Sequence, residues 1–456
     1  MAAPDSGTRF FSSARASTGF VSWLALAAAI LGTASMLFYH QALFIPRALA
    51  VQTAKGLGNG YSFGNDFYQV WLTAREWLRH GQDPYSPEMT REIQTGLYGR
   101  PLNPDRATDP VDKRRFPYPL FADLLFWPAA EFPFSRACVA IVCVLAGLAV
   151  ATALLWLQVL HWRPAWKWVA VAVLLTMSAY PTLEGLYACQ LGLLVAFLLP
   201  ASVLALQRNR TFLAGVLMAI ATIKPQVTAL PILYLLLWSA HGWRTRGRLL
   251  IGLFSTLTLL VGASLLVSPH WIQSWIATLQ AYHHYTRPPI LTQVFASWLQ
   301  PRISGVTTSV LTAVLIVAAM ILAWRNRAAD AASFAFLLTL ALLLTITTIA
   351  LLPGQAIYDH VILLPAVLLV VHSRHELIHA GLVPRVLLAV GALVLFWPWM
   401  AAFALIAMRP LLAPATFSST AVLSLPLRSA ASLPFAALAL VAWTLRLTPA
   451  TNPESA

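Results

Sequence analysis

Long apolar blocks, separated by short connections that carry most of the basic residues, constrain this chain more than any other feature. Only 10% of its 456 residues are charged, against about 25% in a soluble globular protein. Many of the blocks approach the roughly 20 residues that an α-helix needs to cross a bilayer. The alternating segments of about 10 residues that build a membrane β-barrel are not found in the sequence. The sequence therefore predicts an all-α, polytopic transmembrane helical bundle.

The apolar blocks predict about 12 transmembrane helices in one integral-membrane domain over residues 19–447. The first helix is expected at about 19–38. Its apolar run is longer than that of a signal peptide and no small-residue cleavage site follows, so we expect it to stay uncleaved. Two polar segments interrupt the series, at 40–119 and 268–305.

The basic residues explain the orientation and the formal net charge of +14. They recur in alternate connections, namely Arg163 and Lys167, Arg208 and Arg210, Arg244, Arg246 and Arg248, Arg325 and Arg327, and Arg374 and Arg385. The connections at 181–187 and 353–359 carry no basic residue. This positive-inside pattern places both tails, 1–18 and 448–456, in the cytoplasm. The protein is then expected in the cell inner (plasma) membrane, with both polar segments outside and no nucleic-acid partner.

The first polar segment contains an amphipathic helix expected over 66–80, where Phe67, Val70, Trp71 and Ala74 follow helical spacing. Asp66 opens this helix at the outer membrane surface. A carboxylate there could act as a general base that takes a proton from an acceptor hydroxyl. The alternative is a helix cap, because Asp66 and Gln69 have the spacing of a capping box.

Other polar residues of the first segment are weaker candidates. Asp83 lies in Gly81-Gln82-Asp83-Pro84-Tyr85, where an Asp side chain bonded to nearby backbone in a turn is the favoured interpretation. Tyr68, Asp83 and Tyr118 are counted as substrate-binding candidates. The basic run 113–115 could hold a lipid phosphate or form a solvated loop.

Two polar residues stand at the ends of later apolar blocks. Lys224 has no other charge nearby, and an ionisable group at membrane depth is a functional hypothesis by default. We expect it to bind a phosphate, although a snorkelling lysine is the alternative. Gln190 could bond a sugar hydroxyl or pack against another helix.

The second polar segment and the start of a later block supply further candidates. Arg287 is a second phosphate ligand candidate, and His284 beside it is a substrate-binding candidate. Tyr358 and His360 enter the membrane together with Asp359, which could instead cap a helix. His360 could contact a phosphate, and Tyr358 the substrate.

These residues resemble those of the bacterial GT87 glycosyltransferases (domain of unknown function 2029) of the GT-C superfamily, which include polyprenol-phosphate-mannose-dependent mannosyltransferases. The resemblance rests on Asp66-Phe67, Gly81-x-Asp83-Pro84-Tyr85, Phe116-x-Tyr118-Pro119, Gln190, Lys224-Pro225 and Tyr358-x-His360, in the expected order over about residues 60–370. It implies a GT-C-like fold whose first outer loop carries a catalytic aspartate, and it assigns that role to Asp66. The family's usual Asn two residues after the Gln is Gly192 here, and its later Asn-Gln-Ser piece is Thr292-Gln293-Val294.

The sequence therefore predicts a hexosyltransferase that moves a sugar, by family likeness mannose, from a polyprenyl-phosphate donor to a lipid or glycan acceptor at the membrane. Such a donor is already activated, so neither a metal nor a cofactor is expected. The alternative is a non-enzymatic carrier or flippase for a lipid-linked sugar. A carrier more often shows inverted repeats, and no clear repeat is visible. A Walker loop is also missing, which argues against ATP-driven transport.

Overall fold

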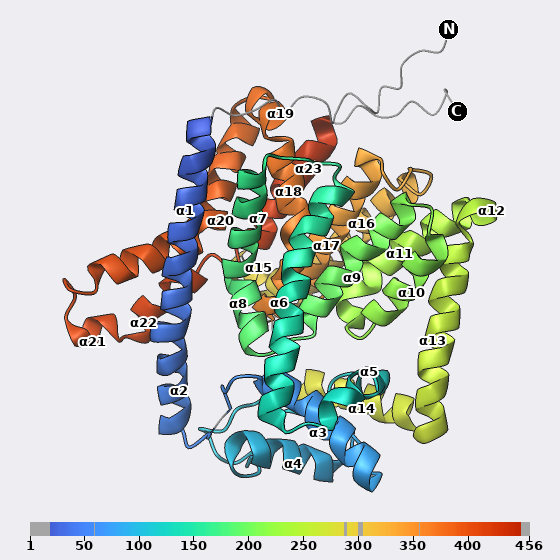
Figure 1. The fold of residues 1–456 in the computed structure, drawn as a ribbon, viewed down its shortest axis with the longest axis vertical. Coiled ribbons are helices and arrows are strands. Elements are labelled where there is room, and N and C mark those ends of the chain that lie inside the picture. Colours follow the sequence, from blue (N-terminus) through green and yellow to red (C-terminus); the bar gives the residue numbers. More distant parts are fainter. Residues whose placement is uncertain (1–18, 59, 287–289, 300–303, 355, 448–456) are drawn as a thin grey trace.

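The computed structural model describes residues 19–447 except 59, 287–289, 300–303 and 355. In this part of the chain every named element is a helix, and one isolated antiparallel bridge joins Ile290 and Pro353. The prediction of an all-α fold is confirmed. Figure 1 shows an upright bundle whose lower end is closed by helices that lie across it.

Five helical stretches of the described chain are long and apolar enough to cross a membrane. They are α1 with its continuation (Gly19–Ala54), α6 (Phe134–Val159), α13 (Arg248–Val267), α16 (Ser304–Arg325) and α20 (Leu382–Met408). A sixth is possible by length if α7 (Trp166–Ser178) and α8 (Tyr180–Tyr187), which meet at 54°, form one broken span. The predicted count of about 12 is therefore not confirmed.

Shorter apolar helices occupy most of the remaining predicted spans. They are α9 (Gly192–Gln207), α10 (Thr211–Ala221), α11 (Pro225–His241), α17 (Phe334–Ala350), α18 (Leu364–His372) and α23 (Leu433–Leu447). Proline begins α11, where its missing N–H costs nothing. Nearly every residue of α17 is buried, so this helix is apolar because it lies inside the bundle. Hydropathy alone does not distinguish such a buried helix from a membrane span.

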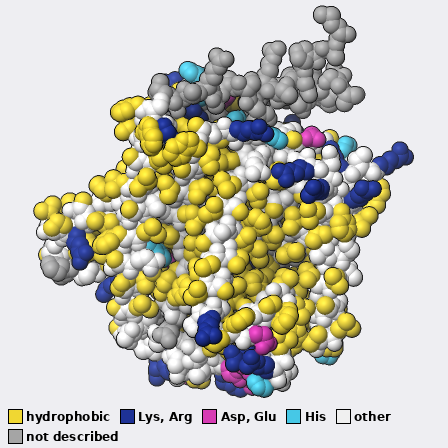
Figure 2. All heavy atoms as spheres, in the orientation of Figure 1, with side chains coloured by type: hydrophobic (Ala, Val, Ile, Leu, Met, Phe, Trp, Pro, Cys, Tyr) yellow, Lys and Arg dark blue, Asp and Glu magenta, His cyan; other side chains and the backbone are white. Residues whose placement is uncertain are grey.

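The outer surface carries the apolar side chains expected of a membrane protein. On the face in Figure 2, hydrophobic side chains cover the middle, and most charged side chains lie toward the two ends. Large apolar side chains are exposed along the long helices, among them Val139 on α6, Leu259 on α13 and Val310 on α16. Exposed apolar area of this extent is stable in contact with lipid rather than water.

The first helix is longer than predicted. After α1 (Gly19–Phe38) it continues through the π-helix η2 (Tyr39–Phe44) into α2 (Ile45–Ala54). The polar residues Tyr39 and His40, which follow the predicted end of the helix, are fully buried and bonded to Leu423 and Glu184. The segment predicted to begin at residue 40 is therefore helical as far as Ala54.

The rest of the first polar segment folds into helices at the lower end of the bundle. These are α3 (Asn65–His80), α4 (Pro87–Tyr98) and α5 (Phe121–Ala130). The helix predicted over 66–80 is confirmed, and its apolar face from Phe67 to Ala74 is buried, whereas Leu78 is exposed. Residues 99–120 have no regular helix, and the Arg100–Asp109 ion pair closes a loop within them.

The second polar segment supports the first. It contains α14 (Trp271–Thr286) and α15 (Leu291–Leu299). Figure 1 shows α14 beside α5 at the lower end, and the indole of Trp275 donates a hydrogen bond of 3.0 Å to the carbonyl of Pro117. Short elements complete the chain, namely α12 (Trp243–Arg246), η4 (Ile357–Leu363), α19 (Arg374–His379), α21 (Pro414–Phe417), α22 (Thr420–Leu423) and η5 (Leu425–Leu427).

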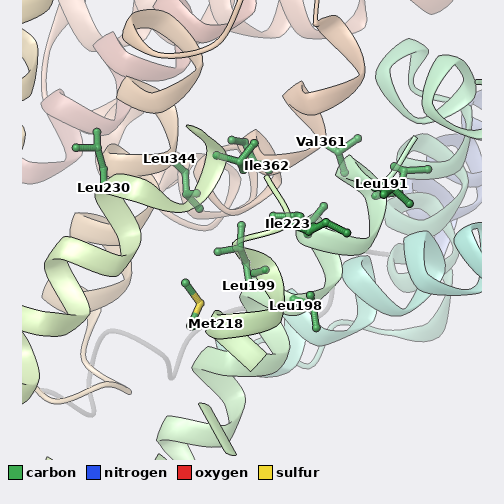
Figure 3. Packing of buried hydrophobic residues seen from close by; sticks show 14 of the residues in the cluster. Leu191, Leu198, Leu199, Met218, Ile223, Leu230, Leu344, Val361 and Ile362 are labelled. Carbon is green, nitrogen blue, oxygen red and sulfur yellow. The ribbon is translucent and has the colours of Figure 1, made fainter. Parts of the chain in front are cut away.

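The hydrophobic core brings together three chain segments that bear candidate site residues. Leu191, Ile223 and Val361 belong to one buried cluster, from the start of α9, the α10–α11 connection and η4. Figure 3 shows this packing at close range. Their chain neighbours are Gln190, Lys224 and His360. Apolar packing therefore fixes the backbone from which these polar side chains project.

Candidate active site

Asp66 lies in the first turn of α3 but does not cap it. The N-cap residue is Gly64, with φ of 76° and no side-chain cap. Carbonyls at the C-terminal end of α8 accept backbone amide hydrogens instead, from Gly64 to Tyr187 at 2.8 Å and from Phe67 to Ala188 at 3.3 Å. The capping alternative for Asp66 is therefore wrong, and its carboxylate is available for side-chain contacts.

Both carboxylate oxygens of Asp66 accept hydrogen bonds from distant parts of the chain. Nη1 of Arg114 donates to Oδ1 at 2.6 Å, and Nε2 of Gln190 donates to Oδ2 at 2.5 Å. The hydroxyl of Tyr118 donates to Oε1 of the same glutamine at 3.4 Å. The structure thus gathers Asp66, Tyr118 and Gln190 around one carboxylate. Burial raises the pKa of Tyr118 well above its usual value, so its hydroxyl remains a donor.

Arg114 has a strained backbone conformation, and several hydrogen bonds hold its backbone and side chain in place. It is one of four non-glycine residues in the described chain with positive φ, at 52°, and its N–H donates to the Asp112 carboxylate at 2.9 Å. Its guanidinium also donates to the Tyr98 hydroxyl at 3.2 Å. Burial works to lower the pKa of Arg114, but the charge of Asp66 and the contacts of Tyr98 and Asp112 outweigh it and raise that pKa well above its usual value. Strained backbone of this kind clusters at functional sites.

A second ion pair is buried near the first. Nζ of Lys224 lies 2.8 Å from Oδ1 of Asp359, with side-chain exposures of 5% and 3%. The same Nζ lies 4.8 Å from the ring centroid of Tyr358, a cation–π distance. Asp359 does not cap its helix, because the N-cap of η4 is Ala356 and it has no side-chain cap bond. Lys224 therefore has a structural counterion inside the bundle and is not a snorkelling lysine.

The turn between Gln190 and Gly192 connects the two ion pairs. Gln190 contacts Asp66, whereas a Cβ built at Gly192 would lie 2.1 Å from Oδ1 of Asp359 and 3.2 Å from Nζ of Lys224. Any larger residue would push the Asp359 carboxylate aside. This close approach gives a physical reason for glycine where the resemblance leads us to expect asparagine.

The other phosphate-binding candidates have different outcomes. His360 is 3% exposed, and neither of its ring nitrogens has a hydrogen-bond partner within the described chain. Its role in binding a phosphate stays a prediction. Arg287 and the side chain of His284 lie outside the described residues. In the part of the chain that is described, no three His, Cys, Asp or Glu side chains are placed to hold a metal ion.

Two substrate-binding candidates do not join the cluster around Asp66. The Tyr68 ring packs against Trp71 and Phe134, and its hydroxyl fills the space that a Cβ on Gly96 of α4 would need. Asp83 is exposed in a turn, where its Oδ1 accepts the N–H of Tyr85 at 3.0 Å. The turn interpretation of Asp83 is confirmed.

The sequence reasoning missed a buried network around Glu184 of α8. Tyr61 donates to both carboxylate oxygens of Glu184, at 3.0 and 2.8 Å, and Nε2 of His40 lies 3.4 Å away. The network holds the helix whose last residue, Tyr187, accepts the amide of Gly64. The available signal was the isolation of Glu184, which is the sole acidic residue between Glu131 and Asp330.

Replacing Gly64 by alanine is expected to destabilise the protein and to displace Asp66. The new Cβ would meet Sγ of Cys138 at 2.4 Å, and the residue would also keep a φ of 76°. Left-handed backbone costs about 1–2 kcal/mol and overpacking about 1–3 kcal/mol. The matched control is Gly81→Ala, where φ is 66° and nothing lies within 4 Å. The melting temperature in detergent should fall clearly more for Gly64→Ala; equal losses would contradict the close-packing argument.

The comparison with family models identifies the enzyme family of this chain. The model described as Glycosyltransferase family 87 matches residues 116–353, just over half of the chain. The matched range contains Tyr118, Gln190 and Lys224, whereas Asp66 and His360 lie outside it. Neither a curated protein nor a solved structure matches the chain. By this match over more than half of its length, the chain belongs to glycosyltransferase family 87.

Proposed function

We propose that this membrane glycosyltransferase transfers a hexose, with mannose as the first choice, from a polyprenyl-phosphate donor to a hydroxyl of a lipid or glycan acceptor. The observation that carries the proposal is the convergence of a carboxylate, Asp66, with the two cations Arg114 and Lys224 at the end of an apolar bundle. A base and positive charge are the two requirements for moving a sugar from a phosphate to a hydroxyl.

Asp66 serves in this proposal as the general base. Its carboxylate takes the proton of the acceptor hydroxyl, whose oxygen then attacks the anomeric carbon from the side opposite the phosphate. A single displacement of this kind inverts the configuration at that carbon. Asp359 is an unfavourable covalent nucleophile, because its carboxylate is buried in an ion pair with Lys224.

The remaining residues of the site are proposed to bind the donor. Lys224 and His360, with Arg287 from the second polar segment, would hold the phosphate as it leaves. Tyr118, Gln190 and Tyr358 surround the same region and can bond sugar hydroxyls. His284 and Tyr68 are retained only as weaker substrate-binding candidates, since the first lies outside the described side chains and the second lies apart from Asp66. Asp83 is no longer proposed to bind substrate, because its carboxylate is bonded within an exposed turn.

A lipid-linked donor fits the placement of the site. Asp66 belongs to the first turn of α3, which lies across the lower end of the bundle in Figure 1, and the long helices of the bundle expose large apolar side chains. We propose that this end faces outward from the inner membrane and that both termini lie in the cytoplasm, as the distribution of basic residues favours. Nucleotide sugars are not available on that side, whereas a polyprenyl-phosphate sugar reaches the site within the bilayer.

The proposal is tested by supplying different donors to the purified protein in vesicles together with a membrane lipid extract as acceptor. Radiolabel from polyprenyl-phosphate mannose should enter the acceptor, and free polyprenyl phosphate should appear. Nucleotide-linked mannose is the control donor and should give no transfer. Transfer from the nucleotide donor alone would contradict the proposed donor class. Label that crosses the bilayer on an unchanged lipid would identify a carrier instead.

A further inference from the structure

We propose that Arg114 is a further catalytic residue, whose guanidinium is the counterion of Asp66 before reaction and of the leaving phosphate during it. The inference rests on the proposed function and adds a residue that couples proton transfer to departure of the phosphate. It starts from one contact, the 2.6 Å ion pair between Arg114 Nη1 and Asp66 Oδ1.

The charges of the described site residues explain why proton transfer to Asp66 should be coupled to departure of the phosphate. Arg114 is paired with Asp66, and Lys224 with Asp359, so each cation of the site already has a carboxylate partner. A sugar phosphodiester brings one negative charge, and its phosphate acquires a second when the bond to the sugar breaks. Neither of these two described cations therefore has an uncompensated positive charge in the resting site with which to stabilise the phosphate.

Protonation of Asp66 supplies that charge at the required moment. The proton of the acceptor hydroxyl moves to Asp66, the hydroxyl oxygen bonds to the anomeric carbon, and the bond between that carbon and the phosphate oxygen breaks. Its electron pair stays on the phosphate, which becomes a dianionic monoester. Neutral Asp66 no longer balances Arg114, whose positive charge is then available to the phosphate. An interaction that strengthens only as the reaction proceeds increases kcat.

The surroundings of Arg114 hold its guanidinium in place during this exchange. Nε donates to the Tyr98 hydroxyl at 3.2 Å and Nη2 lies 3.5 Å from the Gly60 carbonyl, so neither contact depends on the charge of Asp66. The side chain is 19% exposed and that of Asp66 14% exposed, which leaves both reachable from the site. Gln190 keeps its bond to the other carboxylate oxygen and so maintains the position of Asp66.

The test compares Arg114→Gln with Arg106→Gln, an exposed arginine of the same irregular segment. Two measurements are made on each full-length protein in vesicles, namely transfer kinetics from the polyprenyl-phosphate donor and equilibrium binding of polyprenyl monophosphate. Arg114→Gln should lower kcat by about 100- to 1,000-fold, as for loss of one preorganised donor at a developing anion. Combined with Asp66→Asn, whose neutral side chain stands in for the protonated base, it should weaken polyprenyl monophosphate binding by about 10-fold relative to Asp66→Asn alone; as a single change it should alter the donor KM much less than kcat. Arg106→Gln should match the wild type.

The outcomes separate this inference from the proposed function. Reduced kcat with no loss of polyprenyl monophosphate binding in the Asp66→Asn background would overturn the inference, since Arg114 would then only position Asp66. A wild-type protein that neither uses the donor nor binds polyprenyl monophosphate would overturn the proposed function. If Arg114→Gln does not fold, Arg114→Lys is used instead. Lysine keeps the positive charge but lacks the planar guanidinium with its several N–H donors. That variant should retain polyprenyl monophosphate binding and part of kcat; loss of both would contradict the inference.

Discussion

Asp66→Asn is expected to reduce sugar transfer by about 100- to 10,000-fold, the range typical of a lost general base. The asparagine side chain has almost the same shape, and its Oδ1 can still accept the hydrogen bond that Arg114 donates to Asp66. What it cannot do is take a proton from an acceptor hydroxyl. The expected result is a folded protein that binds the donor but transfers its sugar very slowly. Initial rates from radiolabelled polyprenyl-phosphate mannose, with the melting temperature as the check on folding, measure both properties.

Asp83→Asn is the matched control for this change. It makes the same substitution in the same polar segment, at an exposed turn where asparagine preserves the bond to the Tyr85 amide. Its transfer rate should equal that of the wild type. Full transfer by Asp66→Asn would show that the base lies elsewhere and would direct attention to Asp359, the other buried carboxylate of the site.

Short-range sequence patterns correctly predicted the elements that depend on residues close together in the chain, namely α3 and the turn at Asp83. The spacing of Phe67, Val70, Trp71 and Ala74 predicted α3, since one apolar face must be buried wherever the helix packs. The predicted end of this helix at residue 80 and the turn at Asp83 are also present. These features depend on neighbouring residues, so the sequence contains enough information to locate them.

The partners of the site residues could not be predicted in the same way. Asp66 is bonded to Arg114, 48 positions away, and to Gln190, 124 positions away. In the sequence, Arg114 is one of three consecutive basic residues, and no local pattern distinguishes it as the one with positive φ that bonds to Asp66. The pairing of Lys224 with Asp359 spans 135 positions and depends on the missing side chain of Gly192. Long-range packing decides such contacts.

The count of membrane helices is not decided by hydropathy, for a different physical reason. A window of apolar residues has the same hydropathy whether lipid or protein surrounds it, so a helix such as α17, buried inside the bundle, gives the same signal as a span that faces lipid. The first helix is longer than predicted, and the polar residues Tyr39 and His40 just beyond its predicted end are both buried. Polar residues that find partners within the protein do not end a helix.

Breaking the Lys224–Asp359 pair from one side is expected to cost about 3–5 kcal/mol of stability, because the remaining charge is buried without a partner. Lys224→Met and Asp359→Asn should each lower the melting temperature and abolish most sugar transfer. The double variant Lys224→Met with Asp359→Asn leaves neither charge, so it should recover much of the lost stability. The coupling between the two changes, obtained from a double-mutant cycle, should therefore be large.

Activity of the double variant decides what Lys224 does. If Lys224 holds the leaving phosphate, a stable protein without it should still transfer sugar poorly, and polyprenyl monophosphate should bind more weakly. Recovery of activity together with stability would show that the pair only supports the fold around Gly192, and that Arg114 and residues of the second polar segment hold the phosphate. A single Lys224→Met variant as stable as the wild type would contradict the buried ion pair itself. Single variants change stability and catalysis together. The double variant therefore separates the structural contribution of Lys224 from its proposed contribution to catalysis.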